Sequence, residues 1–293
     1  IKEVSREAQP ATDLVIGGSG LVGGYIVEHL VKRGQRPLAM SRAPRCDSRI
    51  DWHRGDLLAA GALKLPPFST LYCTADAVLL AEALPLLVHP SLKRLVAFSS
   101  TSVITKQDTE VAEERAMIKR LEAAEPKIAE ICEQHGIGWT LLRPTLLYAE
   151  GRDTNITPLS RLIRTFGFMP LVGGGPGLRQ PVHAEDLAIA AIAAAQRDVA
   201  INKFYSLPGS ETVTYREMIG RVFDGMAMPR RFIRIPPWLW RAIFPVVKPL
   251  FPGANVAMGI RMMKDMTFDP TPARNDLGWD PRAFRPVFDK NVD

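Results

Sequence analysis

The sequence predicts an α/β fold: a doubly wound parallel sheet with helices on both faces and a smaller, interleaved C-terminal lobe. Two observations indicate this. Short apolar segments alternate with segments of helical periodicity through the first half of the chain, and a glycine cluster joins the first apolar segment to the first helix. This alternation is typical of parallel strands joined by right-handed helical crossovers.

The elements follow from the pattern in order. Strands are expected at the short apolar runs 13–17, 37–41, 50–53, 70–74, 93–99 and 138–142. Helices are expected where apolar residues recur every three to four positions, at 21–34, 76–88, 109–135 and 184–196. Glycine and proline cluster after Pro144, and residues 203–293 are rich in proline, which predicts a change of architecture there.

The glycine cluster carries the first functional signal. It runs from Gly17 to Gly23 and comprises Gly17, Gly18, Ser19, Gly20, Leu21, Val22 and Gly23. Gly17 permits a tight turn, Gly20 lets the backbone approach a pyrophosphate, and Gly23 lets the helix pack closely on the strand. Free N–H groups at the helix start hold the anion. Between a strand and a helix, the cluster predicts a Rossmann-type site for a nicotinamide dinucleotide; a plain turn is the alternative.

This site sets the expected domains. We expect a flexible lead-in at 1–12, a Rossmann dinucleotide-binding domain at 13–202, and a smaller lobe at 203–293 that binds a substrate or partner. The 46% hydrophobic content is ample for a packed core. Three cysteines without metal spacing and five scattered histidines predict neither disulfides nor a metal site. The chain has no run of 18 apolar residues, so no membrane-spanning helix is expected.

The end of the second expected strand indicates which dinucleotide binds. An acidic residue there would bind the ribose 2′-hydroxyl of NAD(H), but this chain has Ser41 followed by Arg42. A hydroxyl and a guanidinium suit a 2′-phosphate, so we predict NADP(H) in preference to NAD(H). Asp56 and Leu57 follow the third strand and can flank the adenine. The alternatives are a surface arginine at Arg42 and a helix cap at Asp56.

Five segments occur in the order found in a known family. They are 17–23, 55–57, 98–103 (Phe98-Ser99-Ser100-Thr101-Ser102-Val103), 142–145 and 179–187, and 275–281 follows them. This set resembles the extended or atypical short-chain dehydrogenases/reductases of the NAD-dependent epimerase/dehydratase type, over about residues 13–286. The resemblance implies an NAD(P)-dependent oxidoreductase or sugar-nucleotide epimerase.

The family's acid/base pair is missing. Such enzymes use a Tyr-x-x-x-Lys pair beside a hydroxyl residue, because an ammonium lowers the pKa of the phenol for proton exchange. Ser100 and Thr101 both occupy the hydroxyl region, and Lys127 falls at the lysine position. Ala123 stands where the tyrosine belongs. The sequence therefore predicts no ordinary tyrosine-dependent catalysis.

The resemblance also assigns residues around the reaction centre. Arg143 and Pro144 would shape the nicotinamide end of the pocket. Arg179 corresponds to the position that holds a substrate diphosphate in sugar-nucleotide enzymes, a surface arginine being the alternative. His183 is a candidate contact to a substrate or partner, and the alternative is a structural histidine that hydrogen-bonds near the sheet edge.

The net charge of +6 is concentrated in one stretch. Residues 225–264 contain no acidic residue but seven cations: Arg230, Arg231, Arg234, Arg241, Lys248, Arg261 and Lys264. Because the excess charge is local, nucleic acid is not an expected partner. Tryptophans lie among these cations, so 230–264 is predicted to face an anionic membrane surface or a membrane-protein complex. A short helix packed on the C-terminal lobe is the alternative.

Two functional classes remain after these observations. Segments 17–23, 164–171, 180–182 and 264–267 are similar to the nucleotide-binding accessory subunit of respiratory complex I, a relative that also lacks the usual tyrosine. This favours a bound-cofactor, structural role in the cytoplasm or mitochondrial matrix, peripheral to a membrane. The alternative is an NAD(P)-dependent oxidoreductase or epimerase with an atypical proton donor.

Overall fold

The structure is a computed structural model that describes residues 13–107, 109–247 and 256–288. The expected lead-in at 1–12 and Lys248 of the basic stretch lie outside the described residues. Among the described helices, none combines the length and the apolar character needed to cross a membrane.

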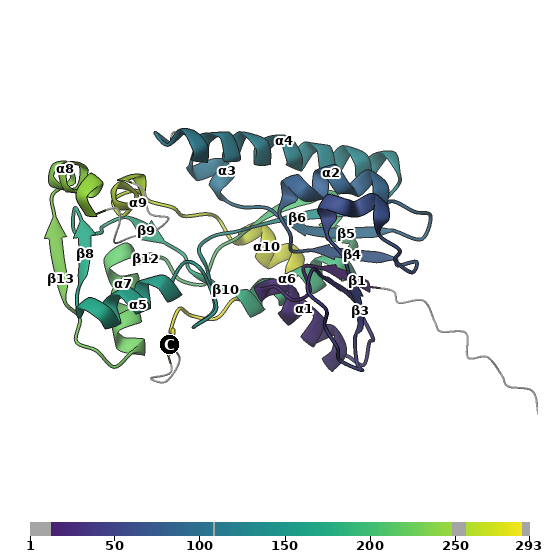
Figure 1. The fold of residues 1–293 in the computed structure, drawn as a ribbon, viewed down its shortest axis with the longest axis horizontal. Coiled ribbons are helices and arrows are strands. Elements are labelled where there is room, and N and C mark those ends of the chain that lie inside the picture. The colour runs from purple at the N-terminus through teal and green to yellow at the C-terminus, as the bar shows by residue number, and fades with distance from the viewer. Residues whose placement is uncertain (1–12, 108, 248–255, 289–293) are drawn as a thin grey trace, which may run out of the picture. The chain divides into compact units, whose positions relative to one another are not determined.

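A seven-stranded sheet carries the Rossmann part of the fold (Figure 1). Its strands are β1 (Asp13–Ile16), β2 (Leu38–Ser41), β3 (Asp51–Arg54), β4 (Thr70–Cys73), β5 (Arg94–Phe98), β6 (Gly138–Pro144) and β11 (Lys203–Leu207). Their order in space is β11-β6-β5-β4-β1-β2-β3. The pairs β3–β2, β2–β1, β1–β4 and β4–β5 are parallel. Because the strand order reverses between β1 and β4, the sheet has the predicted doubly wound topology.

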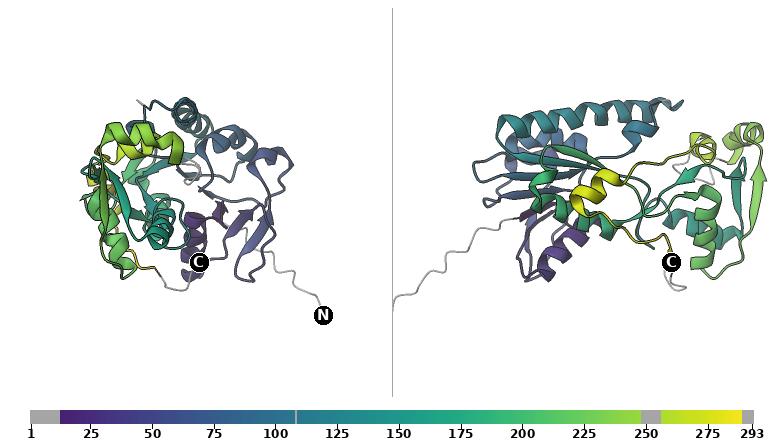
Figure 2. Two further views of the ribbon diagram at one scale, coloured as in Figure 1. Left: turned by 60° about the vertical axis from the view of Figure 1, so that its left-hand side comes forward. Right: turned by 180° about the vertical axis from the view of Figure 1, so that it is seen from behind.

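Helices cover both faces of this sheet. They are α1 (Leu21–Lys32), α2 (Ala77–Leu87), α4 (Ala112–Gln134) and α6 (Ala184–Gln196), all within the ranges expected from the sequence. Helices α2 and α4 lie over one face and α1 over the other (Figure 1), and the view from behind shows the same layers (Figure 2). The Arg33 guanidinium, just after α1, donates to Gln196 at the end of α6 at 3.1 Å. The α/β class is confirmed.

The remaining elements are short. They are the 3-10 helices η1 (Leu57–Ala62) and η2 (Asp198–Ala200), helices α3 (Ser102–Thr105), α5 (Thr157–Phe166), α7 (Tyr215–Gly225), α8 (Pro237–Val247), α9 (Val256–Arg261) and α10 (Thr271–Leu277), and strands β7 (Leu147–Tyr148), β8 (Met169–Val172), β9 (Leu178–Arg179), β10 (Val182–His183), β12 (Val213–Thr214) and β13 (Phe232–Ile235). These strands form three two-stranded sheets, β10–β7, β12–β9 and β13–β8.

The chain forms two compact units that interleave along the sequence. Among the described residues, unit 1 comprises 13–99, 123–141 and 191–204, and unit 2 comprises 100–107, 109–122, 142–190, 205–247 and 256–288. Segments from both halves of the sequence therefore build each unit, as the predicted interleaved lobe requires. The expected division into 13–202 and 203–293 stays a prediction.

Burial explains why the first elements form. All four residues of β1 are buried, as expected for a parallel strand covered on both faces. Helix α1 buries Val22, Ile26, Val27 and Leu30, a stripe at helical spacing. Unit 2 has its own core around Phe223 and Phe284, built from α5, α7, β8 and the C-terminal segment.

Candidate functional site

The turn between β1 and α1 has the backbone that its glycines predict. Gly17 has φ +78°, a conformation that residues with a side chain rarely adopt. A Cβ on Gly23 would lie 2.2 Å from the Gly17 carbonyl oxygen, so only glycine lets the helix begin this close to the turn. At the N-terminus of α1, Gly20 brings no side-chain cap. The N–H groups of the first turn, from Leu21 to Gly23, are thus arranged to hold an anion.

Thr74, which the sequence analysis missed, supports this turn from the end of β4. Its hydroxyl is within hydrogen-bond distance of the carbonyl oxygens of Ile16, at 3.2 Å, and Gly17, at 3.3 Å. A Cβ on Gly17 would come 2.5 Å from the Thr74 hydroxyl oxygen. The signal that could have identified Thr74 is its position directly after the strand that pairs with β1.

The end of β2 lies beside the glycine turn. The Gly18 N–H donates to the Met40 carbonyl at 3.2 Å, and the Ser41 hydroxyl donates to the Ser19 hydroxyl at 3.0 Å. Arg42, the next residue, is exposed. Within the described part of the chain, no hydrogen bond or ion pair engages its guanidinium. This corner of unit 1 therefore presents two hydroxyls and a cation.

Asp56 caps a helix, the alternative weighed for it. Its carboxylate accepts from the Leu58 N–H at 3.1 Å, at the start of η1. Leu57 beside it is buried. The cap engages one carboxylate oxygen, so the contact of Asp56 and Leu57 with adenine stays a prediction.

Unit 2 brings four of the predicted residues to one cavity of about 300 Å³: Ser100, Thr101, Pro144 and Arg179. The Thr101 hydroxyl donates to the Pro144 carbonyl at 3.0 Å. The Ser100 hydroxyl oxygen accepts from the Ser102 N–H at 3.1 Å. Both hydroxyls therefore remain candidates for the active-site position. Arg143 is half-buried and does not line this cavity.

Helix α4 offers no acid/base pair at the expected place. Lys127 and Ala123 are both exposed, whereas the buried face of the helix carries Ile118, Ala124, Glu125, Ile128 and Cys132. A side chain that exchanges a proton with a substrate must face the pocket. The exposure of Lys127 gives no support to its predicted role.

Four tyrosines, Tyr72, Tyr148, Tyr205 and Tyr215, all lie outside α4. Tyr72 and Tyr148 are buried, and burial is the largest cause of the raised pKa of each. Burial also raises the pKa of Tyr215 to about 12. Tyr205 is buried and hydrogen-bonded to the Asp276 carboxylate at 2.6 Å. A catalytic phenol needs the opposite shift, a lowered pKa, so none of the three shifted tyrosines suits proton exchange at neutral pH.

Arg179 is buried rather than on the surface, with 4% of its area exposed. Its guanidinium donates to the carbonyls of Leu178 and Lys264, both at 2.7 Å, and to that of Arg261. Tyr215 lies under it, with the ring centroid 5.4 Å from the guanidinium carbon. Burial lowers the pKa of Arg179. The cation is held by backbone carbonyls at a cavity wall, where it can also meet an anion.

His183 is buried and engaged through both ring nitrogens. Its Nδ1 accepts from the Glu185 N–H at 3.2 Å, and its Nε2 lies 3.5 Å from a Glu150 carboxylate oxygen. Burial opposes ionisation of Glu150, yet the hydrogen bond from His183 and the backbone bring the pKa of Glu150 below its usual value. These contacts favour the structural alternative for His183.

Comparisons with known proteins agree with this fold. No family model matches the chain. NADH dehydrogenase [ubiquinone] 1 alpha subcomplex subunit 9 of Arabidopsis thaliana mitochondria is 26% identical over 265 residues. That match covers 80% of this chain, which spans 61% of the relative's length. UDP-glucose 4-epimerase of Vibrio cholerae is 21% identical over 306 residues, covering 93% of this chain and 91% of the relative.

Solved structures match over nearly the whole chain. UDP-glucose 4-epimerase of Thermotoga maritima, solved with UDP-glucose, has a TM-score of 0.69 at 14% identity, covering 93% of this chain and 94% of that one. UDP-glucuronic acid 4-epimerase of Bacillus cereus, solved with UDP-glucuronic acid and NAD, has a TM-score of 0.70 at 15% identity, with the same two coverages. The chain has the fold of an extended short-chain dehydrogenase/reductase.

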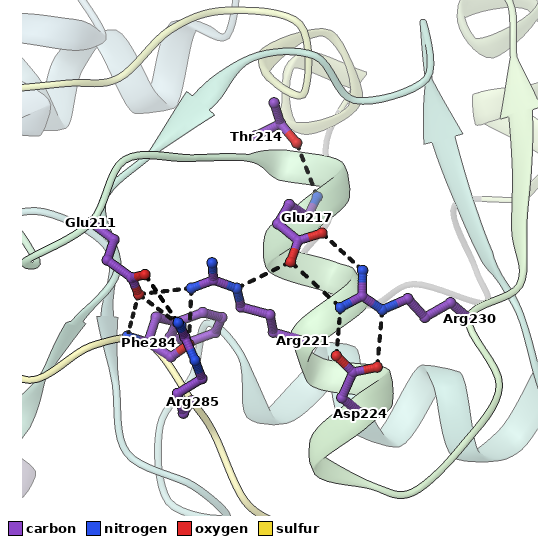
Figure 3. Close-up of polar contacts among 8 residues, drawn as sticks. All are labelled: Glu211, Thr214, Glu217, Arg221, Asp224, Arg230, Phe284 and Arg285. Atoms are coloured by element: carbon purple, nitrogen blue, oxygen red, sulfur yellow. Dashed lines mark hydrogen bonds and ion pairs between the residues drawn. The ribbon is translucent and has the colours of Figure 1, made fainter.

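The basic stretch 225–264 differs from its prediction. Acidic residues from other segments neutralise three of its cations. Arg230 pairs with Glu217 and Asp224 of α7 (Figure 3), Arg241 with Glu110 at 3.3 Å, and Arg261 with Glu114. The prediction counted charge along the sequence and could not see these partners. Arg231, Arg234 and Lys264 remain exposed.

The aromatic residues of this stretch likewise include both exposed and buried side chains. Trp238 on α8 is 71% exposed, but Phe244 on the same helix is 6% exposed and therefore faces the protein. Trp240 stacks near Phe244, with ring centroids 5.1 Å apart, and its Nε1 donates to the Val256 carbonyl at 3.0 Å. Of these three rings, only that of Trp238 is exposed enough to contact a membrane or a partner. Helix α8 spans only Pro237–Val247, which agrees with the short helix weighed as the alternative for this stretch.

Proposed function

We propose that the protein holds NADP(H) as a resident cofactor and does not carry out tyrosine-dependent hydride chemistry. A contrast between two regions carries this proposal: the glycine turn has the close packing that a dinucleotide-binding turn needs, while the buried face of α4 has neither phenol nor ammonium. General acid–base groups contribute about 10²–10⁴-fold in rate. Loss of the pair leaves a binding site without its proton donor.

The preference for NADP(H) rests on the corner formed by Ser19, Ser41 and Arg42. The hydroxyls lie 3.0 Å apart, and the exposed guanidinium follows directly. A 2′-phosphate would receive charge-assisted hydrogen bonds there. A carboxylate, which would repel that phosphate, is absent from positions 41 and 42. NAD(H), present in the Bacillus cereus epimerase structure, is the alternative cofactor.

A second candidate function is that of an accessory subunit on a membrane-associated respiratory complex. It is favoured by the 26% identity to the Arabidopsis subunit and by the exposed apolar side chains of α8, Trp238 at 71% and Val246 at 79%. An anionic membrane surface or a membrane-protein complex would cover them, with Arg231 and Arg234 nearby in sequence. The location would be the cytoplasm or the mitochondrial matrix, peripheral to the membrane.

The opposing proposal is an oxidoreductase or sugar-nucleotide epimerase that uses another proton donor. Ser100, Thr101 and Arg179 line one cavity, as such an enzyme needs. In that case neither Lys127 nor His183 would have the role predicted from the sequence. Lys127 is exposed, and both ring nitrogens of His183 already have partners.

Cofactor content distinguishes these proposals. The purified protein is denatured, and the released nucleotide is identified by mass spectrometry and quantified against protein. We expect NADP(H) in a ratio near one to one, retained through gel filtration. A protein that is empty after purification and binds either cofactor weakly would contradict the resident-cofactor proposal and favour an enzyme that exchanges its cofactor.

A further inference from the structure

A second cavity of about 300 Å³ lies in unit 2, beyond the one that holds Ser100 and Thr101. Most of its wall is apolar. They are formed by side chains of α5, β8, α8 and α9, including Leu159, Leu162, Met169, Trp240, Met258 and Met262. The two cavities share Lys106, Leu146, Asn155, Arg179 and Met266.

The apolar wall is held in place by specific packing. A Cβ on Gly259 would lie 2.3 Å from Trp240 Nε1, so glycine brings α9 directly against this indole. The hydrogen bond from Trp240 Nε1 to the Val256 carbonyl fixes the ring. Methionine side chains, which adapt to irregular ligands, form much of the remaining wall. The cavity is therefore preformed and suited to a flexible apolar group.

One end of the cavity is cationic. Lys106, Arg179 and Arg261 all line it. The carboxylate of Glu114 pairs with Lys106 at 3.3 Å and with Arg261, while that of Asp265 accepts from the Leu178 N–H at 2.9 Å. Arg179 has only carbonyl oxygens as hydrogen-bond acceptors among the described residues. Among the residues that the structure describes, three cations thus face two carboxylates, and the most buried cation, Arg179, has no anionic hydrogen-bond partner.

We propose that this cavity binds an amphiphile with one anionic head group and a single alkyl chain. The head, a phosphate or carboxylate, would lie against Lys106 and Arg179, and the chain would lie between α5 and α9. Burial of a guanidinium without a carboxylate is costly, and an anionic head would offset that cost. The volume is at the low end for ligand pockets, which favours one chain over a two-chain phospholipid.

The wall composition argues against a nucleotide in this cavity. A nucleobase needs several hydrogen-bonding side chains, but the polar uncharged ones here are Thr154 and Asn155, both exposed, and Tyr215. The inference does not depend on the dinucleotide, because every lining residue belongs to unit 2. Failure of the resident-cofactor proposal would leave it standing.

Competition binding tests the ligand class. The full-length protein, delipidated and measured with and without NADPH, is titrated with the fluorescent fatty acid 11-(dansylamino)undecanoic acid. Dodecyl phosphate and dodecanoate, below their micellar concentrations, are expected to displace it. Dodecyltrimethylammonium, inorganic phosphate and UDP-glucose are expected to displace it at least about tenfold less well, since each lacks the anionic head or the chain. Which of the two anions binds more tightly distinguishes a phosphate head from a carboxylate.

Two pairs of variants locate the site. Met258→Glu places a carboxylate in the cavity wall, and its control is Met117→Glu on α4, because both methionines are 49% exposed. Lys106→Ala removes a cation from the cavity, and its control is Lys119→Ala, an exposed lysine on α4. We expect each cavity variant to weaken dodecyl phosphate binding at least about tenfold and each control to leave it unchanged. Circular dichroism confirms that all four variants are folded.

Three results would overturn the proposal. One is equal displacement by the dodecyl cation and the dodecyl anion, which indicates non-specific apolar binding. Another is displacement by UDP-glucose in preference to dodecyl phosphate, which indicates a nucleotide ligand. The third is a folded Met258→Glu protein that binds dodecyl phosphate as well as Met117→Glu does.

Discussion

Two regions of the fold, the glycine turn before α1 and the buried face of α4, differ in how far they match the motifs predicted for them. In the turn, Gly17 has φ +78° and Gly23 leaves room for the Gly17 carbonyl, so the backbone itself forms the anion site. On α4, the buried positions carry Ile118, Ala124 and Glu125, and the expected Lys127 faces solvent. The first region has the backbone geometry that its motif predicts, and the second carries neither a phenol nor an ammonium on its buried face.

This difference indicates how binding and catalysis separate. A phosphate site made of backbone N–H groups depends on conformation, and any residue that fits the turn preserves it. Proton transfer depends on one phenol and one ammonium at fixed positions, and a single substitution removes it. A protein of this fold can therefore bind a dinucleotide without turnover, and the predictions on the turn, on Arg42 and on Ala123 test that separation.

The largest effect is expected in the turn. Gly23→Ala would place a Cβ 2.2 Å from the Gly17 carbonyl oxygen, and this clash cannot be relieved without moving the turn. We expect a loss of about 2–4 kcal/mol in the free energy of unfolding, together with loss of dinucleotide binding. Chemical denaturation and nucleotide titration measure both.

The matched control is Gly24→Ala, one residue further along α1. A Cβ there would meet only the Gly18 carbonyl, at an ordinary 3.7 Å. Because alanine favours helix by about 1 kcal/mol over glycine, this variant is expected to be as stable as wild type or more so. If both alanines were equally tolerated, the close approach at Gly23 would not be what shapes the turn.

The next effect concerns the cofactor's 2′-phosphate. Arg42→Ala is expected to weaken NADPH binding by about 1.5–3 kcal/mol, the contribution of a charge-assisted hydrogen bond, and to leave NADH binding unchanged. Arg45→Ala is the control, since Arg45 is also exposed but lies three residues further from β2. Calorimetric titration of both cofactors provides the measurement. Equal affinity of the wild type for NADPH and NADH would contradict the assignment.

A smaller effect is expected from the charge network around Glu211, which joins α7 to the C-terminal segment through Arg221 and Arg285. Hydrogen bonds from Arg285 are the largest cause that brings the pKa of Glu211 to about 2, with Arg221 adding to it (Figure 3). A carboxylate with a lowered folded-state pKa stabilises the protein above its unfolded pKa. That contribution is lost as pH falls from about 4.5 to about 2.

Because Glu211 and Arg285 are partly exposed, the loss should stay below about 1 kcal/mol. Glu211→Gln should flatten the dependence of unfolding free energy on pH in that window. Glu110→Gln, which removes an exposed carboxylate with one ion pair to Arg241, should leave the slope nearly as it is. If the unfolding free energy of Glu211→Gln changed with pH as steeply as that of the wild type, the ion pairs of Glu211 would not be a source of acid sensitivity.

No effect is expected from restoring the missing phenol at its sequence position. Ala123→Tyr recreates a Tyr-x-x-x-Lys pattern with Lys127, but both positions are exposed. The new phenol would face solvent, so NADPH oxidation with carbonyl substrates should stay at the wild-type level. A clear gain in turnover would mean that this part of α4 does face a substrate.

The sequence predicted most of the Rossmann part because local signals and topology agree there. Alternating apolar strands and periodic helices appear where expected, and Gly17 and Gly23 have the geometry that the motif requires. The cavity that joins Ser100, Thr101, Pro144 and Arg179 also follows the order of family motifs. Each of these motifs is short and lies near the end of one strand, so local sequence is enough to place it.

What the sequence could not predict depends on contacts between distant segments. Arg261 is neutralised by Glu114 and Arg241 pairs with Glu110, both far away in the sequence. Spacing placed Lys127 at the family's lysine position, but it could not show which face of a 23-residue helix is buried. The support that Thr74 gives the turn likewise depends on the pairing of β4 with β1.

The most direct test follows the bound cofactor. The nucleotide bound to the purified protein is first fully reduced. The protein is then incubated with a broad panel of carbonyl compounds and UDP-sugars, and the redox state of the nucleotide is measured over time. We expect NADPH to stay bound in a ratio near one to one and to stay reduced. Repeated oxidation at rates of about 1–10³ per second, ordinary for an enzyme, would contradict it.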